Sequence, residues 1–267
     1  MEFPVGRFET VITDPLFYVV ATIGILLVGI SKGGFGGGLG MLGVPMMALV
    51  IDPILAAAIL LPILCMMDVL GVWAYRRTFD RVNLMILVPA AFAGTVIGTL
   101  TFKFMSVDML RLMIGLLAVW FTLDYAIRKR IGRLPPKTPP NALKGGFWGT
   151  VAGFTSFIAH AGGPPLNVYM LPQRLDKTLY VGTTVILFFT INWVKLIPYS
   201  WLGLFDATTL LTALILLPLA PVGIYLGIWL HSRIPQDLFY TLCYGFLFAT
   251  GCKLLWDGSR GILGVSA

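Results

Sequence analysis

Long apolar runs, separated by short polar stretches, occupy almost the whole chain. A helix needs about 20 apolar residues to cross the roughly 30 Å hydrocarbon core of a bilayer. Runs of this length, with few charges, predict membrane-spanning helices at 53–75, 82–104, 109–127, 178–200, 207–230 and 237–256. The pattern therefore predicts an all-α, polytopic membrane protein.

Two further apolar segments contain glycine-rich interruptions. Residues 15–51 would form a helix about 55 Å long, which is too long for a single span. Glycine favours a break in a helix, and a dense glycine run lies at 31–38. Residues 142–172 have the same form, with the interruption at 161–165. We therefore expect two broken, re-entrant helices, each with two limbs that enter the membrane partway and turn back.

The two halves of the chain resemble each other. Small residues recur in the same order at an offset of 125 and later of 129 residues, as in the pairs Gly24 and Gly149, Ser31 and Ser156, Gly37 and Gly162, Pro89 and Pro218, and Gly98 and Gly227. Ordered matches of this kind indicate an internal duplication. The expected organisation is a first repeat at 1–127, a basic, proline-rich cytoplasmic linker at 128–141, and a second repeat at 142–267.

Charges in equivalent loops bear on whether the repeats point the same way. Residues 76–81 carry three positive charges, whereas the matching residues 201–206 carry none. The loop at Asp52 has no positive charge, whereas its counterpart contains Arg174 and Lys177. Cytoplasmic loops collect Lys and Arg, so opposite bias in matching loops is typical of inverted repeats. Two parallel halves of four spans each are the alternative, and the loops favour inversion.

Composition supports the membrane assignment. Hydrophobic residues make up 58% of the 267 residues and charged residues 12%, with a mean hydropathy of +0.89. A soluble domain usually has about twice that charged fraction. The net charge of +7 could indicate a nucleic-acid partner, but the Lys and Arg residues lie between the apolar runs, as the positive-inside rule predicts. We expect a multi-pass protein of the bacterial inner membrane that retains its first apolar run.

Broken helices at equivalent places in inverted halves predict a binding site near the middle of the membrane. A half-helix that starts there presents free backbone N–H groups and the positive end of its dipole to an anion, and glycines let the anion approach. We expect such starts near 37–39 and 163–165. The candidate substrate-binding glycines are Gly33, Gly34, Gly36, Gly37, Gly38, Gly162 and Gly163. Close helix packing is the alternative role, and it explains so dense a run less well.

Charged residues within apolar runs cost about 2.5 kcal/mol or more each, so they are usually functional or paired. Lys32 is the strongest candidate to bind an anion, with snorkelling to an interface as its alternative role. Asp68 and Lys195 lie at nearly equivalent places, and both an ion pair between them and contact with the substrate are open. Asp68 could instead take up a proton in coupled transport. His160 could donate to an anion, titrate near neutral pH, or be a structural hydrogen-bonding residue.

Neutral polar side chains complete the candidate site. Ser31 and Asn167 could donate hydrogen bonds to an anion, as could Thr155, Ser156 and Asn192, although hydroxyls and amides also bridge helices. The Cys and His residues have no metal-ligand spacing in the sequence, so neither a metal nor a cofactor is expected.

The glycine-rich segments resemble those of the sulfite exporter TauE/SafE family, a group of bacterial anion transporters. The resemblance rests on residues 29–40 with a Val-Pro pair at 44–45, and on a weaker copy at 153–164. The duplicated layout also matches, so the likeness covers nearly the whole chain. It implies transport of sulfite, sulfonates or related organosulfur anions, coupled to an ion gradient, for which we take H+. His160 and Ala161 stand where the second copy is often richer in glycine, which leaves open whether both halves bind substrate equally.

Three functions are open. The first is a secondary transporter that works by alternating access of the two halves. The second is a membrane-embedded enzyme that acts on a lipid-linked phosphate, and the third is a passive anion channel. Undecaprenyl-pyrophosphate phosphatases also use inverted repeats, but their chemistry needs clustered Glu, Arg and Ser, and Glu occurs here only at positions 2 and 9. The residues therefore favour a transporter of a small anion and not an enzyme, and the resemblance implies that this anion contains sulfur. A channel and a homodimeric assembly stay open.

Overall fold

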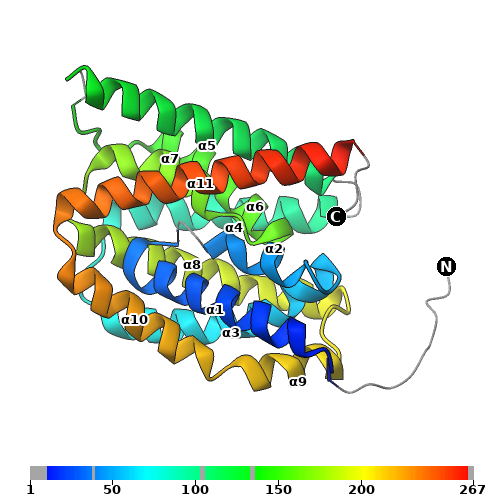
Figure 1. Ribbon diagram of the computed structural model, residues 1–267. Coiled ribbons are helices and arrows are strands. Elements are labelled where there is room, and N and C mark those ends of the chain that lie inside the picture. The colour runs from blue at the N-terminus through cyan, green and yellow to red at the C-terminus, as the bar shows by residue number, and fades with distance from the viewer. Residues whose placement is uncertain (1–10, 38–39, 103–105, 133–135, 264–267) are drawn as a thin grey trace.

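A computed structural model describes residues 11–37, 40–102, 106–132 and 136–263 (Figure 1). Within these ranges all regular elements are helices, which confirms the all-α prediction. They are α1 (Pro15–Phe35), η1 (Gly40–Leu42), α2 (Gly43–Met47), α3 (Pro53–Tyr75), α4 (Arg81–Thr101), α5 (Val107–Arg130), α6 (Ala142–Ala159), α7 (Gly163–Met170), η3 (Leu171–Gln173), α8 (Lys177–Trp201), α9 (Ala207–Leu216), α10 (Leu219–Arg233) and α11 (Gln236–Ile262).

Within the described part of the chain, five helices are long and apolar enough to cross a membrane, namely α1, α3, α4, α8 and α11. A sixth candidate consists of α9 and α10, which meet at a bend of 44° next to Pro218. The predicted span at 207–230 is therefore bent, because proline cannot donate to the helical ladder. The predicted span at 109–127 lies inside α5, whose 24 residues are long enough to cross.

The first broken segment is asymmetric. α1 has 21 residues and ends at Phe35, after which Gly36 and Gly37 adopt φ angles of 67° and 85°. These angles suit glycine, which lacks a Cβ. α2 has five residues and begins only at Gly43, later than the start expected near 37–39. Because the glycine run lies well past the start of the apolar segment, α1 is long enough to span the bilayer and only the return limb is short.

The second broken segment follows the prediction more closely. α6 ends at Ala159 after 18 residues, and α7 begins at Gly163 with prolines in its first turn. The break therefore occupies residues 160–162, and residues 163–165 of the expected interruption already belong to α7. His160 caps α6 with a left-handed φ of 50°, a conformation that costs a side-chain-bearing residue roughly 1 kcal/mol. The local contacts of this histidine must offset that cost.

Glycines bring helices from the two halves into close contact. α1 and α10 run parallel, with Gly29 against Gly223 and Gly34 against Gly227. In the same way α4 and α6 run parallel, with Gly153 packed on the backbone of Ala91. Small residues allow this approach between membrane helices.

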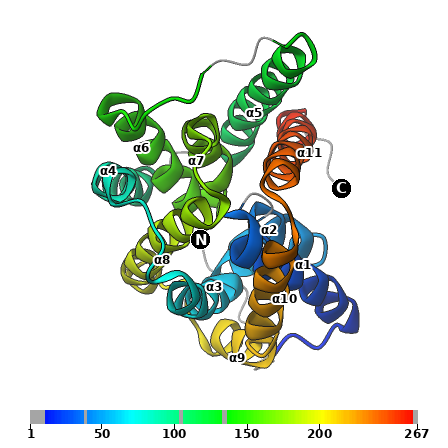
Figure 2. The same ribbon diagram turned by 90° about the vertical axis from the view of Figure 1, so that its left-hand side faces the viewer.

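Two other pairs run antiparallel. Along α3 and α8, Gly71 lies against Val185, and Tyr75 at the end of α3 lies against Gly182. Along α5 and α11 the contacts likewise progress in opposite directions, and Figure 1 shows the two helices side by side at one edge of the bundle. An end-on view places α8 between α4 and α3 (Figure 2). In the order of the two predicted repeats, α3 matches α8 and α5 matches α11, so each of these helices packs antiparallel to its counterpart.

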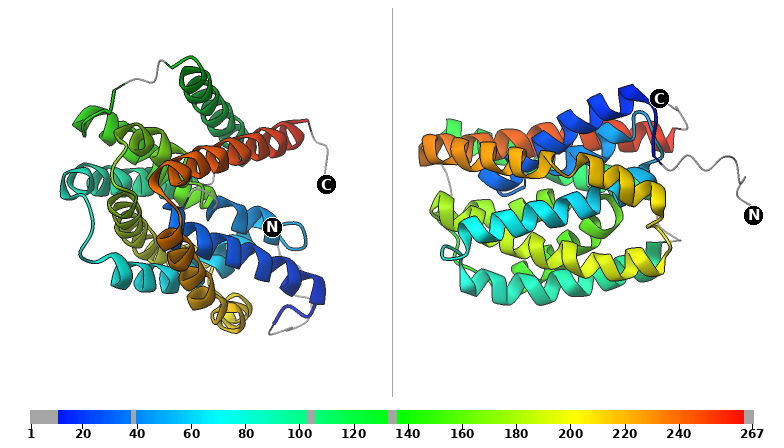
Figure 3. Two further views of the ribbon diagram at one scale, coloured as in Figure 1. Left: turned by 60° about the vertical axis from the view of Figure 1, so that its left-hand side comes forward. Right: turned by 90° about the horizontal axis from the view of Figure 1, so that it is seen from below.

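The ends of the bundle differ in charge. The loop after α3, the end of α5, the loop before α8 and the end of α10 carry most of the described basic residues. This end is called the basic end below. α1 begins and α11 ends at the opposite end (Figures 1 and 3). From the positive-inside rule we expect the basic end to face the cytoplasm.

Candidate functional site

A group of buried polar side chains lies between α3, α8 and the tip of α1. Lys32 is 6% exposed, and its Nζ lies 2.5 Å from Oδ1 of the fully buried Asp68. The other carboxylate oxygen of Asp68 accepts a hydrogen bond of 2.7 Å from Nδ2 of Asn192. The sequence left a pair between Asp68 and Lys195 open, but the ion-pair partner of Asp68 is Lys32. The last turns of α1 face α3, and this brings the two charges together.

Asp68 and Asn192 hold the same position in their helices. The side chains of Asp52 and Asp176 cap the first turns of α3 and α8 in the same way. Asp68 follows its cap at the same spacing as Asn192 follows Asp176. The hydrogen bond between them therefore joins matching positions of the two predicted repeats.

Lys195 points toward the second break instead. Its Nζ donates to Ser156 O at 3.0 Å and to Ser156 Oγ at 3.2 Å, and it lies 2.9 Å from Nδ1 of His160. A lysine ammonium only donates, so Nδ1 of His160 is the acceptor. The proton of the neutral imidazole is then on Nε2, which lies 3.2 Å from Ala57 O. This assignment rests on the hydrogen-bond network, and it ties the left-handed cap at His160 to both α3 and α8.

A small cavity lies where the two breaks meet. Gly37 and Gly40 line it from the first break, and His160 and Gly163 line it from the second. Lys32 reaches it as the charged group, and the remaining lining residues include Ser156, Phe188 and Asn192. The cavity has a volume of about 30 Å³. Since a cavity needs roughly 10–15 Å³ to hold one water, this one suits a very small ligand.

Phe188 separates the two breaks near the middle of α8. A Cβ on Gly37 would lie 3.2 Å from its ring, and a Cβ on Gly162 would lie 3.1 Å from it. Nζ of Lys32 lies 5.9 Å from the ring centroid, within the range of a cation–π contact. The ring therefore packs against both turns and the cation at once.

The predicted glycines have different surroundings. A Cβ on Gly33 would meet Ile224 O at 2.6 Å, so this residue and Gly34 are positioned for contact with α10, the packing role that the sequence left as an alternative. Gly36 faces Tyr180 and Thr184, and Gly162 faces α6. Gly38 lies outside the described residues. Among the six that the structure describes, Gly37 and Gly163 line the cavity.

Ser31 and Asn167 do not line the cavity. The carbonyl of Ser31 accepts from the Gly37 N–H at 3.0 Å and helps to shape the turn. Oδ1 of the fully buried Asn167 accepts from the Tyr180 hydroxyl. Ser156 and Asn192, which the sequence offered only as neutral donors, do reach the cavity. The position of Asn192, which matches that of Asp68 in the other half, is the signal in the sequence that could have identified it as a site residue.

The helix starts at the breaks offer fewer N–H groups than expected. α7 begins with Gly163 and two prolines, which have no N–H. The N–H of Leu166 donates to Gly162 O, so among the first four residues of α7 only Gly163, which lines the cavity, has an N–H not used in that way. The positive end of the α7 dipole still faces this space. Lys32 is therefore the main cationic group available to an anion there.

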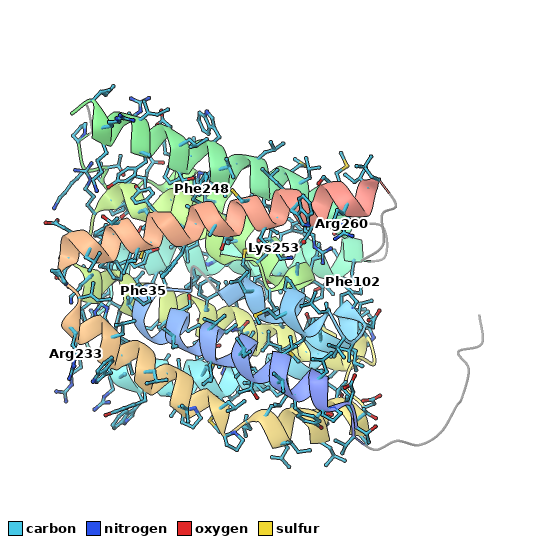
Figure 4. The ribbon with its side chains drawn as sticks, viewed as in Figure 1. Phe35, Phe102, Arg233, Phe248, Lys253 and Arg260 are labelled. Atoms are coloured by element: carbon cyan, nitrogen blue, oxygen red, sulfur yellow. The ribbon has the colours of Figure 1, made fainter. Side chains whose placement is uncertain are left out.

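A larger cavity of about 350 Å³ lies on the other side of His160. Ala57 and Tyr199, which line it, lie 3.2 and 3.5 Å from the imidazole Nε2. Arg111 is the cation in its lining, and Phe102 marks its outer end, away from the basic end (Figure 4). Residues 158–161 and the histidine side chain separate the two cavities.

Aromatic side chains pack between the small cavity and the basic end. The fully buried Tyr180 packs under Gly36, and its ring contacts Phe239 at a centroid distance of 5.6 Å. The ring of Phe35 stacks on the same phenylalanine. The Tyr75 hydroxyl donates to Gly33 O at 2.6 Å, which satisfies a carbonyl at the end of α1.

Comparison with known families gives one finding. The model of the family described as "Sulfite exporter TauE/SafE" matches residues 21–254. This range includes both breaks, the ion pair and all the helices from α2 to α10. Neither a curated protein nor a solved structure matches the chain.

Proposed function

Because the chain belongs to the sulfite exporter TauE/SafE family, we propose that it is a secondary transporter of sulfite or a small organosulfonate, with the small cavity between the two breaks as its binding site. The family identifies a membrane transport protein and not an enzyme. The observation that carries the proposal is the position of Lys32, a buried cation that lines the junction of both broken segments.

Alternating access of two inverted halves accounts for the arrangement of the helices. The antiparallel packing of α3 with α8 and of α5 with α11 supports inversion, because an in-plane two-fold axis relates matching helices in this way. The larger cavity and these aromatic side chains lie on opposite sides of the site. The structure is then consistent with a state that is sealed toward the cytoplasm, with the larger cavity as the vestibule on the other side.

The ion pair suggests how a proton is coupled to the anion. While Asp68 is ionised, its carboxylate holds Lys32, and a second anion next to it would be repelled. Protonation of Asp68 would release the lysine, and the incoming anion would take the place of the carboxylate. Proton and anion would therefore move in the same direction.

His160 and Lys195 would connect the site to the vestibule. The imidazole separates the two cavities, and the lysine fixes its orientation from α8. A shift of the 158–161 turn would open the small cavity to the larger one. Lys195 would add positive potential without contacting the anion.

The test is transport into liposomes. We expect purified protein to accelerate uptake of sulfite and of methanesulfonate, with saturation and with acceleration by unlabelled substrate on the far side. Uptake without saturation or exchange would indicate a channel. Failure of every small anion to move, in liposomes where the protein is shown to be folded, would refute the proposal.

A further inference from the structure

A second cavity system lies at the basic end and shares no lining residue with the two cavities beside the breaks. It consists of a polar pocket of about 520 Å³ next to the start of α11, and of an apolar groove of about 530 Å³ between α5 and α11. The two cavities have Tyr125, Lys129 and Tyr244 in common, so they are continuous.

The polar pocket is positively charged. Lys129 from the last turn of α5, Lys137 from the linker and Arg174 from the turn after η3 line it, against one carboxylate, Asp237. The pocket has a fixed framework, because the Tyr240 hydroxyl donates to Leu175 O at 2.7 Å and joins α11 to the loop before α8.

The groove is apolar and begins directly beside these cations. Leu123, Ala126 and Phe248 line its walls, and Figure 4 shows Phe248 between α5 and α11. Where groove and pocket meet, the rings of Tyr125 and Tyr244 stack with their centroids 3.5 Å apart and an interplanar angle of 3°. Gly245 is exposed and leaves the groove open, since a Cβ there would meet nothing within 4 Å.

The order of these features along the membrane normal matches an amphipathic ligand. Basic pockets between membrane helices at the cytoplasmic surface suit the phosphate of a lipid headgroup. An apolar groove that starts at the same residues suits an acyl chain. A soluble anion would leave the apolar groove empty, and a zwitterionic lipid would leave the charge of the three cations largely unbalanced.

We propose that this composite site binds one anionic phospholipid. Lys129, Lys137 and Arg174 hold the headgroup phosphate, and an acyl chain lies between α5 and α11. These helices end the first and second halves of the chain, so the lipid clamps one half to the other at the cytoplasmic surface. The site is independent of the central anion site and of the transported substrate.

The experiment is native mass spectrometry of the full chain, released from micelles that contain equal amounts of phosphatidylglycerol and phosphatidylcholine. We expect the wild type to retain phosphatidylglycerol preferentially. In the triple variant Lys129→Gln, Lys137→Gln and Arg174→Gln, the ratio of retained phosphatidylglycerol to retained phosphatidylcholine should fall at least tenfold.

A matched control removes three positive charges from the same end but outside the pocket. The variant Arg76→Gln, Arg77→Gln and Arg233→Gln should retain the lipid like the wild type, and Figure 4 shows Arg233 well away from α5. Equal retention by the two triple variants, or no preference in the wild type, would overturn the proposal.

The groove is tested separately by filling it. Gly245→Phe should weaken lipid retention, whereas Gly146→Phe, at another glycine with open space around it, should not. Each protein's thermal unfolding is also recorded with phosphatidylglycerol and with inorganic phosphate alone. Stabilisation by phosphate equal to that by the lipid would overturn the lipid assignment.

Discussion

Replacing Asp68 by asparagine should convert the central site into one that binds anions without a proton. The carboxylate is fully buried and lies 2.5 Å from Nζ of Lys32. Asparagine is close in shape and stands in for the neutral acid. Lys32 then stays in the cavity as a buried cation without its counter-ion.

The expected size of the effect follows from that loss. Removing one partner of a buried ion pair typically costs about 3–5 kcal/mol. An anion that takes the place of the carboxylate recovers part of this cost, and about 1.4 kcal/mol is a factor of ten in affinity. We therefore expect the variant to be less stable without ligand and to bind anions at least tenfold more tightly at neutral pH.

The pH dependence gives the sharper readout. In the wild type, anion binding should strengthen as the pH falls, because protonation of Asp68 frees Lys32. In Asp68→Asn this dependence should disappear. Methanesulfonate is the probe, because its own charge does not change over this range, and binding is measured by calorimetry in detergent at several pH values.

The control is Asp124→Asn, which removes an exposed acid paired with Arg128 on the surface of α5. It should keep the pH dependence of the wild type. If Asp68→Asn bound methanesulfonate with unchanged pH dependence, or more weakly at neutral pH, competition between the carboxylate and the anion would be refuted.

Three further predictions address the site, the packing and the topology. The double variant Lys32→Ala with Asp68→Asn avoids an unpaired buried charge, so it should fold but show no anion binding by calorimetry, and retained affinity would show that Lys32 does not bind the anion. Gly34→Ala places a Cβ 2.5 Å from Gly227 O, so it should lower the free energy of unfolding by about 1–3 kcal/mol, measured by thermal unfolding. Gly40→Ala, which has open space around it, should leave the stability unchanged. Equal stability of the two variants would contradict the close packing of α1 on α10. A phosphatase that is active only outside the cytoplasm should be active when it is fused after α11, because α11 ends opposite the basic end. An inactive fusion whose membrane protein is folded would contradict that orientation.

Local features of the sequence predicted most of the helices. The boundaries of α3 and α8 are within a residue or two of expectation, because aspartate caps and charged loops limit their apolar runs. The second break was predictable from the prolines at 164 and 165, which suit a first helical turn. Lys32 was identified from the cost of a charge inside the membrane.

Features that depend on tertiary contacts were not predictable. The sequence suggested Lys195 as a partner of Asp68, whereas the partner is Lys32, because the pairing depends on which way the end of α1 turns. The sequence also does not show which glycines of the run face α10 and which face the cavity. Gly33 and Gly34 belong to the first group, and Gly37 to the second.

The hydrogen bond between Asp68 and Asn192 bears on the stoichiometry of coupling. The two residues occupy matching positions, so two identical halves would bring two carboxylates within hydrogen-bond distance of each other. Such a pair shares one proton and titrates in two steps. With an amide in the second half, the pair has a single ionisable member, and under the proposed coupling each transport cycle would carry one proton. Divergence of the two halves at this one position would thus have given a symmetric framework an asymmetric, one-proton mechanism.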